Sequence, residues 1–381
     1  MLRIIKSLIN LIFGDIIFLL SCIIPKNDNI WIFGSWGGEK YSDNSKYLFE
    51  YVNKNHPEIR SIWIVKNKKI RKILENKNYE VYGKNSLKAI LISLRAGVFI
   101  VTVNVARDLN IYPSKNAKIV QLWHGTPLKK ILIDVKPPSQ KIKLLKFLFP
   151  YLNENISILT AASSEVKKKY ITAFGIDPER IKITGYPRND GLHSPKKITT
   201  DDKKGIYLPT FRKEYNYNIF QYNFNFQKVE NSLKNMGVHI YIQLHPLDDP
   251  DNKFRRLLSS SKFIHIVEFD DVYSILNDFD FLITDFSSVY FDYLLLEKPI
   301  IFAPFDLETY LSEERELYYD YYSITPGPKA KDWNELLDEI EESLRKPEKY
   351  LNDIKRVKNL FNKYDDCKNC QRVFNEIKNI L

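Results

Sequence analysis

The chain has 381 residues, of which 44% are hydrophobic and 14% are aromatic. This length is more than twice the ~150 residues of a typical single-core domain, so two domains are expected, and the composition excludes a disordered, fibrous or small disulfide-stapled protein. Lys and Arg number 57 against 47 acidic residues, a formal charge of +10. This charge favours polyanionic neighbours such as nucleic acid, phosphorylated metabolites or an anionic membrane, without choosing among them. The three cysteines are too few for a disulfide framework and indicate a reducing compartment.

The N-terminal segment, residues 1–28, is predicted to associate with a membrane. It is mostly apolar from Ile4 to Ile24, but Lys6 and Asp15 interrupt it, and its longest clean run is far shorter than the ~20 residues of a spanning helix. No small-residue cleavage site follows, so a signal peptide is not expected. We expect an uncleaved helix that lies in or against the inner leaflet.

The basic amphipathic segment of residues 129–151 is a second membrane candidate. Lys141, Lys143 and Lys146 lie there among bulky apolar residues. Such a segment suits an anionic lipid surface. The alternative is a helix that packs on its own domain with its lysines in solvent.

Residues 29–190 alternate short β-rich apolar runs with polar helical stretches. Helices are expected over residues 45–54 and 86–95, among others. The expected strands are residues 29–34, 61–66, 98–103, 119–123, 158–162 and 181–184. This alternation is typical of a parallel sheet with helices on its faces.

Residues 191–204 lack apolar periodicity and are rich in Ser, Pro, Lys, Thr and Asp, so they are predicted to form a linker. The alternation returns over residues 205–365, and a charged C-terminal helix is expected at 366–381. The expected strands of the second half are residues 206–208, 239–244, 263–267, 281–284 and 300–303. The predicted fold class is therefore α/β, with two Rossmann-type, doubly wound domains that face a central cleft.

Polar motifs follow the predicted strands. In open α/β sheets the ligand site lies outside the carboxyl ends of the strands, so these positions are the candidates for function. The motifs are WHGTPLKK at 123–130, GYPRND at 185–190, PTFR at 209–212, LHP at 244–246 and ITDFSS at 283–288. Two of the six histidines, His124 and His245, lie directly after predicted strands, one in each half.

A pair of histidines suits group transfer. An imidazole with a pKa near neutrality can take a proton from an attacking hydroxyl, and a second can donate a hydrogen bond to a phosphoryl oxygen. Either histidine alone could instead be a structural residue that caps or packs.

The second half also offers candidate phosphate ligands. Ser287 and Ser288 are predicted to open a helix after a strand, where hydroxyls and backbone N–H groups suit a phosphate, although an ordinary N-cap would have the same residues. Arg212 could form a fork onto phosphate oxygens, or it could pair with Glu214 or another carboxylate.

Several motifs are absent from the sequence. It contains neither a P-loop nor a GxGxxG fingerprint. Its Asp-x-Asp pairs and its His and carboxylate residues offer no convincing metal site. No resident cofactor, no metal and no nucleic-acid partner is expected, and a metal-independent group transfer fits best.

In their order along the chain, the five motifs resemble those of the CDP-glycerol glycerophosphotransferase family, over roughly residues 30 to 365. The resemblance implies a GT-B-like pair of domains, an acceptor domain at 29–190 and a CDP-alditol-binding domain at 205–365. It also implies transfer of glycerol phosphate, or a related alditol phosphate such as ribitol phosphate, from a CDP-alditol to a hydroxyl of a membrane lipid-linked acceptor, with release of CMP. Members build teichoic acid or capsule polymers as peripheral proteins on the cytoplasmic face of the cell membrane.

The resemblance further implies roles for individual residues. His124 is the expected general base on the acceptor hydroxyl, and His245 is the expected partner of the donor phosphates. The other expected contacts are Arg212, Ser287 and Ser288 on the donor phosphates, Asp292 on the donor ribose, and Thr126, Lys129 and Arg188 on the acceptor side.

Two other functions remain open from the sequence. A GT-B glycosyltransferase or epimerase that uses a nucleotide sugar would share the fold, the cleft and the serines. A basic protein that only binds membranes or nucleic acid would not depend on His124. Within the family, the compact length is that of primases, whereas GTPLKK is closer to polymerases, so primase or polymerase, the polyol, the acceptor and the oligomeric state stay open.

Overall fold

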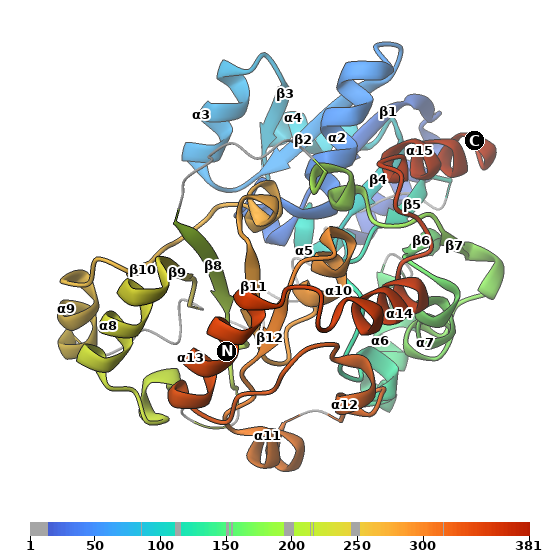
Figure 1. Ribbon diagram of the computed structural model, residues 1–381. Helices are drawn as coiled ribbons and strands as arrows, with labels where there is room; N and C mark the ends of the chain where they lie inside the picture. The colour runs from blue at the N-terminus through green and yellow to red at the C-terminus, as the bar shows by residue number, and fades with distance from the viewer. Residues whose placement is uncertain are drawn as a thin grey trace. The chain divides into compact units, whose positions relative to one another are not determined.

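The computed structural model describes residues 14–84, 86–110, 116–149, 152–153, 155–193, 202–213, 215, 217–244, 252–314 and 316–381. The chain divides into two compact units (Figure 1). The first comprises Met1–His124, Leu132–Gly191 and Asp366–Leu381, and the second comprises Gly125–Ile131 and Leu192–Asp365.

The first unit contains a seven-stranded parallel sheet in the order β3-β2-β1-β4-β5-β6-β7. Its strands are β1 (Asn27–Phe33), β2 (Arg60–Val65), β3 (Glu80–Gly83), β4 (Ala96–Val101), β5 (Lys118–Gln121), β6 (Ile156–Ala161) and β7 (Ile181–Ile183). The sequence predicted all of them except β3. That strand is a four-residue edge strand in which only Val81 is buried, so it gives little apolar signal.

Side chains of successive strand residues point to opposite faces of this sheet, and both faces are buried. Trp31 and Phe33 pack in one core cluster, whereas Ile30 and Ile32 pack in the other. The helices are α2 (Asp43–Asn55), α3 (Lys68–Asn76), α4 (Leu87–Ser93), α5 (Val105–Asp108), α6 (Gln140–Leu148), α7 (Ser164–Phe174) and α15 (Asn369–Asn379). Strands that are apolar on both sides are typical of a parallel sheet covered by helices.

The C-terminal helix α15 belongs to the first unit. Its Phe374 ring lies 5.3 Å from the Trp31 ring in the core. At its start, the backbone N–H groups of Asn369 and Cys370 donate to the carboxylate of Asp190 at 2.9 and 2.8 Å. The C-terminal helix thus packs into the same core as the first strand of the sheet.

The second unit contains a five-stranded parallel sheet in the order β10-β9-β8-β11-β12. Its strands are β8 (Lys203–Leu208), β9 (Val238–Ile242), β10 (Ile264–Ile266), β11 (Phe281–Thr284) and β12 (Ile300–Phe302). Its helices are α8 (Phe226–Met236), α9 (Asn252–Ser259), α10 (Val289–Tyr293), α11 (Leu307–Glu313), α12 (Tyr321–Ile324), α13 (Trp333–Arg345) and α14 (Leu351–Phe361). The predicted fold class, α/β with two doubly wound parallel sheets, is confirmed.

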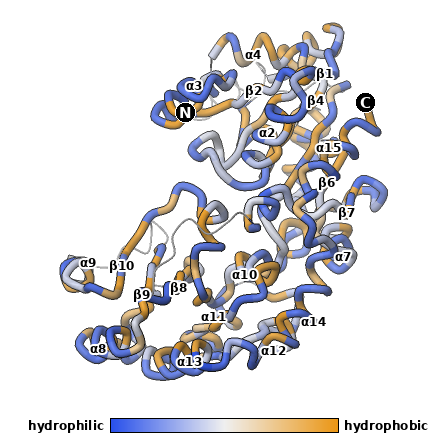
Figure 2. The backbone as a smooth tube through the Cα atoms, turned by 45° about the horizontal axis from the view of Figure 1, so that its top comes forward, coloured by the Kyte–Doolittle hydropathy of each residue, from blue (hydrophilic) through white to orange (hydrophobic). Residues whose placement is uncertain are grey.

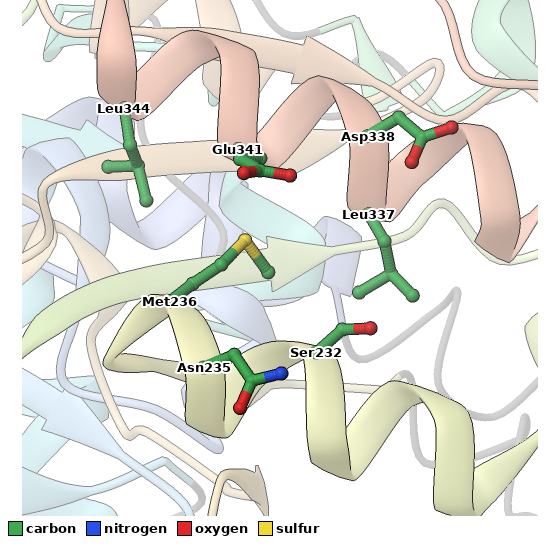
Figure 3. Close-up of a pocket in the computed structure, with 7 residues that line it drawn as sticks. All are labelled: Ser232, Asn235, Met236, Leu337, Asp338, Glu341 and Leu344. Atoms are coloured by element: carbon green, nitrogen blue, oxygen red, sulfur yellow. The ribbon is translucent and has the colours of Figure 1, made fainter.

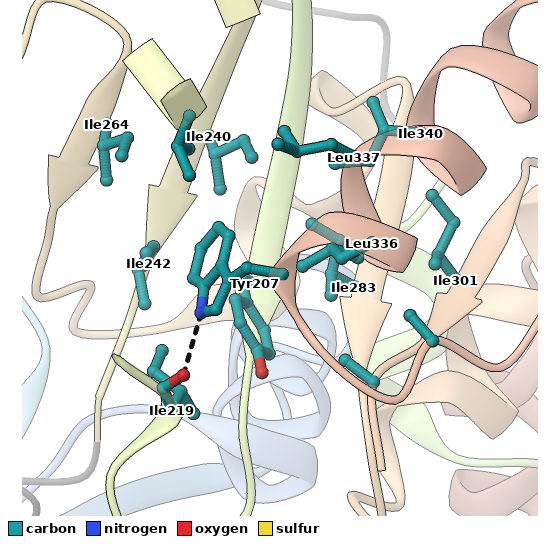
Figure 4. Packing of buried hydrophobic residues seen from close by; sticks show 14 of the residues in the cluster. Tyr207, Ile219, Ile240, Ile242, Ile264, Ile283, Ile301, Leu336, Leu337 and Ile340 are labelled. Atoms are coloured by element: carbon teal, nitrogen blue, oxygen red, sulfur yellow. Dashed lines mark hydrogen bonds between the residues drawn. The ribbon is translucent and has the colours of Figure 1, made fainter. Parts of the chain in front are cut away.

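The core of this unit, part of which is drawn in Figure 4, includes Trp333 at the start of α13. The indole Nε1 donates to the carbonyl oxygen of Ile219 at 2.8 Å, so the polar atom of this buried ring is satisfied. Leu336, Leu337 and Ile340 continue the same face of α13 toward the sheet. Hydrophobic and hydrophilic residues alternate along α13 in Figure 2, as in a helix that covers a sheet with one face.

The segment Gly125–Ile131 belongs to the second unit although it follows β5 of the first. Lys129 forms an antiparallel bridge with Leu317. The N–H of Lys130 donates to the carbonyl of Glu316 at 2.8 Å, and the N–H of Tyr318 donates to the carbonyl of Leu128 at 2.9 Å. The WHGTPLKK motif is therefore divided between the two units directly after His124.

Candidate active site

His124 lies in the loop that follows β5. Its side chain is partly exposed, but its Nδ1 atom is buried and has no hydrogen-bond partner among the residues that the structure describes. Two indole rings flank the imidazole, with centroid distances of 4.1 Å for Trp123 and 5.9 Å for Trp36. A ring nitrogen of His124 is thus not committed to a contact within the described part of the chain.

A buried ion pair lies beside this histidine. Asp43 Oδ1 accepts a hydrogen bond from Arg188 Nη1 at 2.7 Å, and Asp43 Oδ2 accepts one from Trp36 Nε1 at 3.1 Å. Arg188 Nη1 also donates to the carbonyl oxygen of His124 at 2.9 Å. The pair therefore connects α2 and the loop after β7 to the loop that carries His124.

Two further polar side chains connect the loops at this edge of the sheet. Asn44 Nδ2 donates to the carbonyl of Trp123 at 2.9 Å, and its Oδ1 accepts from the backbone N–H of Arg188 at 3.1 Å. The buried carboxylate of Asp108 accepts from the N–H of Gly37 at 3.0 Å and from N–H groups of the loop after β4. The loops that follow β1, β4, β5 and β7 are thereby held by a set of directional contacts.

Three non-glycine residues of this region have a left-handed backbone. The φ angles are +46° at Trp36, +64° at Asp43 and +55° at Trp123. Each such residue costs on the order of 1–3 kcal/mol and persists only where its surroundings fix it. Strain of this kind gathers at functional sites, which agrees with the position of His124 among these residues.

The electrostatic environment keeps His124 uncharged at neutral pH. Burial lowers the pKa of its imidazole, the Asp43 carboxylate opposes this by raising the pKa, and the Arg188 guanidinium lowers it again. The ordinary histidine pKa is about 6.5, so a lowered value leaves the ring neutral at pH 7. A neutral imidazole can accept a proton, as a general base must.

In the second unit, Arg212 lies in the loop after β8 and is buried in an ion network. Its Nε and Nη2 each donate to an oxygen of Asp306 at 2.7 Å, and Nη2 also donates to Asp285 Oδ2 at 2.9 Å. From the sequence, Arg212 could bind phosphate or pair with Glu214 or another carboxylate. The structure shows pairing with the carboxylates of Asp306 and Asp285, whereas Glu214 lies outside the described residues. A contact of Arg212 with donor phosphates stays a prediction.

Ser287 and Ser288 lie between β11 and α10 and are both partly exposed. Ser287 Oγ accepts from the N–H of Val289 at 3.4 Å, and Ser288 is the N-cap residue but forms no side-chain cap bond. The sequence suggested a helix dipole aimed at a phosphate, but α10 has only 5 residues, so its dipole is small. Phosphate binding by these serines therefore rests on their hydroxyls and stays a prediction.

The remaining predicted site residues have the following surroundings. Thr126 is buried, and its Oγ1 has no partner within the described ranges. Lys129 Nζ lies 5.3 Å from the centroid of the Tyr310 ring. Asp292 is buried on α10 and accepts a hydrogen bond from Tyr273 Oη at 3.3 Å. Their contacts with acceptor and ribose stay predictions.

His245, the second predicted histidine, lies outside the described residues. Of the other predicted site residues, His124 and Arg188 lie close together in the first unit. In the second unit it connects Arg212 to Asp285, two residues before the serine pair.

Sequence reasoning missed the residues that surround these side chains, namely Trp36, Asp43, Asn44 and Asp306. Trp36 and Asp306 each follow a strand, so the strand-end rule could have found them. Asp43 and Asn44 look like ordinary residues of a first helical turn, and nothing in the sequence marks their long-range partners.

The second unit also contains a cavity of about 380 Å³ between α8 and α13 (Figure 3). Its lining residues are Ser232, Asn235, Met236, Leu337, Asp338, Glu341 and Leu344. The end of α8 leads into the start of β9, so the cavity lies near the amino end of that strand and includes none of the predicted site residues. Within the described ranges, no three His, Cys, Asp or Glu side chains form a group that could hold a metal ion.

The two units, each built on a parallel sheet of Rossmann type, define a GT-B-like fold. More specifically, the chain belongs to the CDP-glycerol:poly(glycerophosphate) glycerophosphotransferase family, whose sequence profile matches residues 16–379. The family and enzyme class predicted from the five motifs are thus confirmed.

Individual relatives agree with this membership. The teichoic acid poly(glycerol phosphate) polymerase of Bacillus spizizenii is 29% identical over 344 residues, 86% of each chain. The teichoic acid glycerol-phosphate transferase of Staphylococcus aureus is 30% identical over 340 residues, 83% of this chain and 84% of that one. Among solved structures, a histidine-to-asparagine variant of the wall teichoic acid polymerase TagF soaked with CDPG has a TM-score of 0.77 and 25% identity, covering 100% of this chain and 97% of that one.

Proposed function

We propose that this enzyme transfers glycerol phosphate, or a related alditol phosphate, from a CDP-alditol to a hydroxyl of a lipid-linked acceptor in teichoic acid or capsule polymer synthesis. The observation that carries the proposal is the position of His124 in the loop after β5, with a buried Nδ1 that has no partner among the described residues, in a chain that belongs to the CDP-glycerol family. In the reaction, the acceptor hydroxyl gives its proton to His124 while its oxygen bonds to the phosphorus that carries the alditol. The P–O bond to the cytidine side of the pyrophosphate breaks, and CMP leaves.

The donor belongs in the second unit. Ser287 and Ser288 offer partly exposed hydroxyls in the turn after β11. His245, in the segment after β9, would donate to the donor phosphates as negative charge moves to the leaving CMP. Neither a metal ion nor a resident cofactor is part of the proposal.

A panel of nucleotides tests the donor class. The protein is heated with CDP-glycerol, CDP-ribitol, CDP, a UDP-sugar or a GDP-sugar, and release of CMP is followed in parallel. A ligand that binds the folded state raises the unfolding temperature, and at equal concentration a ligand of higher affinity raises it further. We expect a CDP-alditol to stabilise the protein more than CDP does, and the better of the two CDP-alditols identifies the polyol. Stronger stabilisation by a UDP- or GDP-sugar would favour a glycosyltransferase or epimerase instead.

We also propose that the enzyme works at the cytoplasmic face of the cell membrane. Among the described residues, no helix has the length and apolar character needed to cross a bilayer. Residues 14–23 are helical, and the helix exposes apolar side chains at a spacing of i, i+3, i+4 and i+7. They are Ile16, Leu19, Leu20 and Ile23, the last of them 78% exposed. Such a stripe suits insertion into the headgroup region.

Helix α6 offers a second apolar surface with positive charges. Leu144, Phe147 and Leu148 are exposed, Phe147 by 80%, and the neighbouring Lys143 and Lys146 are exposed as well. Exposed aromatic and aliphatic side chains next to lysines suit a membrane that contains anionic lipid.

Flotation with vesicles of phosphatidylglycerol and phosphatidylcholine tests this proposal. We expect Phe147→Ser combined with Leu144→Ser to reduce the bound fraction, and Leu19→Ser combined with Ile23→Ser to do the same. Ile73→Ser is the matched control, because Ile73 is an exposed isoleucine on α3 of the same unit. Equal binding of all variants and the wild type would contradict the role of both surfaces.

A further inference from the structure

One guanidinium connects three strand-end loops of the second unit. Arg212 Nη1 donates to the carbonyl oxygen of Thr210 after β8 at 2.5 Å. Its other donations go to Asp285 after β11 and to both carboxylate oxygens of Asp306 after β12. Four of the five N–H donors of an arginine are therefore engaged by the protein itself.

The carboxylates of this network hold further groups. Asp285 Oδ1 accepts from the backbone N–H of Thr210 at 2.9 Å and from that of Phe286 at 2.5 Å. Tyr215 Oη donates to Asp306 Oδ2 at 2.5 Å. Because Phe286 directly precedes the two serines, the network fixes the backbone where the serine turn begins.

Aromatic rings enclose the guanidinium. The centroids of Tyr217, Tyr310 and Phe286 lie 4.1, 4.6 and 5.0 Å from the Arg212 Cζ atom. Phe286 and Tyr310 stack at 3.7 Å with an interplanar angle of 4°. The side chain of Arg212 is completely buried, so it would have to leave both carboxylates and its rings to reach a ligand.

We infer that Arg212 is a positioning residue: together with Asp285 and Asp306 it fixes the turn of Ser287 and Ser288, so that these serines meet the donor phosphates in a preformed geometry. The inference rests on the proposed function. It assigns Arg212 a different task from that of a phosphate ligand, and it adds Asp306 to the residues on which donor binding depends. A lysine cannot replace Arg212, because one ammonium cannot serve Thr210, Asp285 and Asp306 in the fork geometry of a guanidinium.

A double-mutant cycle of Arg212→Lys and Asp306→Asn tests the inference. We expect each single variant to raise the KM for the CDP-alditol, to lower kcat/KM by about 100-fold, as a misplaced binding group does, and to weaken CDP binding. Because both residues act through one network, the double variant should be little worse than the poorer single variant. A direct phosphate contact predicts the opposite pattern. Asp306→Asn would then keep the wild-type KM while Arg212→Lys raises it, or the two effects would add, and either result overturns the inference.

Tyr215→Phe keeps the inference testable if the ionic variants do not fold. It removes one hydrogen bond to Asp306 and leaves all charges in place, so we expect a smaller rise in donor KM, severalfold at most. An unchanged KM in this variant would count against the inference. Arg345→Lys is the matched control, because Arg345 is exposed on α13 and should leave donor kinetics unchanged. A wild-type enzyme that uses no CDP-alditol would overturn the proposed function before any variant is compared, and this inference with it.

Discussion

The strand ends of the two units hold charged residues in different ways. Around His124, a buried Asp43–Arg188 pair frames an imidazole whose Nδ1 has no partner among the described residues. In the second unit the arrangement is reversed, because the cation of Arg212 is itself enclosed by two carboxylates and three aromatic rings. The partners of a charged residue at a strand end therefore indicate its role. A residue with an unpaired polar atom can contact a ligand, whereas a residue whose polar atoms are paired can fix the loop that contacts the ligand.

The largest expected effect is that of His124→Gln. We expect turnover to fall by about 100-fold or more, because the acceptor hydroxyl loses its proton acceptor, while CDP-alditol binding by the second unit is retained. Turnover and ligand-induced thermal shifts are measured on the same preparation. His193→Gln serves as the control, since His193 pairs with Asp365 in the second unit. Near-normal turnover of a folded His124→Gln enzyme would contradict the role of His124 as general base, and with it the catalytic role of the first region.

Asp43→Asn probes the frame of the first region. It leaves the buried Arg188 guanidinium without its counter-charge, and we expect a loss of about 3 kcal/mol in the free energy of unfolding, measured in urea. Asp43 raises the pKa of His124 and Arg188 lowers it, so the variant should have a still lower imidazole pKa. The acidic limb of the pH–rate profile then moves to lower pH. If the acidic limb of the pH–rate profile stays at the wild-type pH, Asp43 does not influence the pKa of the catalytic histidine.

Tyr321→Phe is a milder probe of the second region. Its Oη donates to the carbonyl oxygen of Asp285 at 3.0 Å, in a buried position. We expect a loss of about 1 kcal/mol in stability and a small rise in donor KM with kcat unchanged. Tyr322→Phe is the matched control, because that neighbouring ring is 62% exposed. A fall in kcat at constant KM would mean that the Arg212 network does more than position the donor.

The smallest expected effect concerns a histidine pair outside both regions. His239 Nδ1 and His265 Nε2 lie 2.9 Å apart, and Asp202 lies 3.4 Å from His239 Nε2. Burial lowers the pKa of His265, His239 lowers it further, and Glu230 opposes both. As the pH falls, His265 therefore takes up a proton in the unfolded chain before it does so in the folded protein. Its contribution to the free energy of unfolding is complete above pH ~6.5 and is lost as the pH falls toward the pKa of His265 in the folded state.

Urea unfolding between pH 5 and 7.5 measures this dependence. The decline toward acid should be shallower for His265→Gln than for the wild type, whereas turnover at pH 7 should be unaffected. Equal slopes would show that His265 does not contribute to the loss of stability toward acid. The remaining slope contains the contribution of His124, whose pKa is also lowered by burial.

Much of the fold follows from the sequence because parallel strands buried on both faces form continuous apolar runs. The runs around Trp31, Phe99 and Ile283 were each predicted as strands, and each lies in the interior of a sheet, with a neighbouring strand on both sides. The strand Glu80–Gly83 was missed because an edge strand needs fewer apolar residues. The assignment of Gly125–Ile131 to the second unit was missed because it depends on backbone pairing with residues 316–318, which leaves no pattern in side-chain polarity.

For the site, the sequence indicates residue types at strand ends but not their partners. Arg188 was expected on the acceptor side, and the structure pairs it with Asp43, 145 residues earlier. Arg212 was expected to hold phosphates or a nearby carboxylate, and it pairs with Asp306, 94 residues later. Such partners depend on which loops the strand order brings together, and one sequence does not reveal that order.

The division of the WHGTPLKK motif affects how this protein can be recombined with its relatives. A fragment of residues 192–365 would lack the segment that pairs with Glu316 and Tyr318, and so would expose an open backbone edge. A chimera that exchanges the second unit must therefore carry residues 125–131 with it and keep 366–381 from the other parent. Its histidine would then come from one parent and the glycine that follows it from the other, which makes the bond between His124 and Gly125 a crossover point for domain exchange.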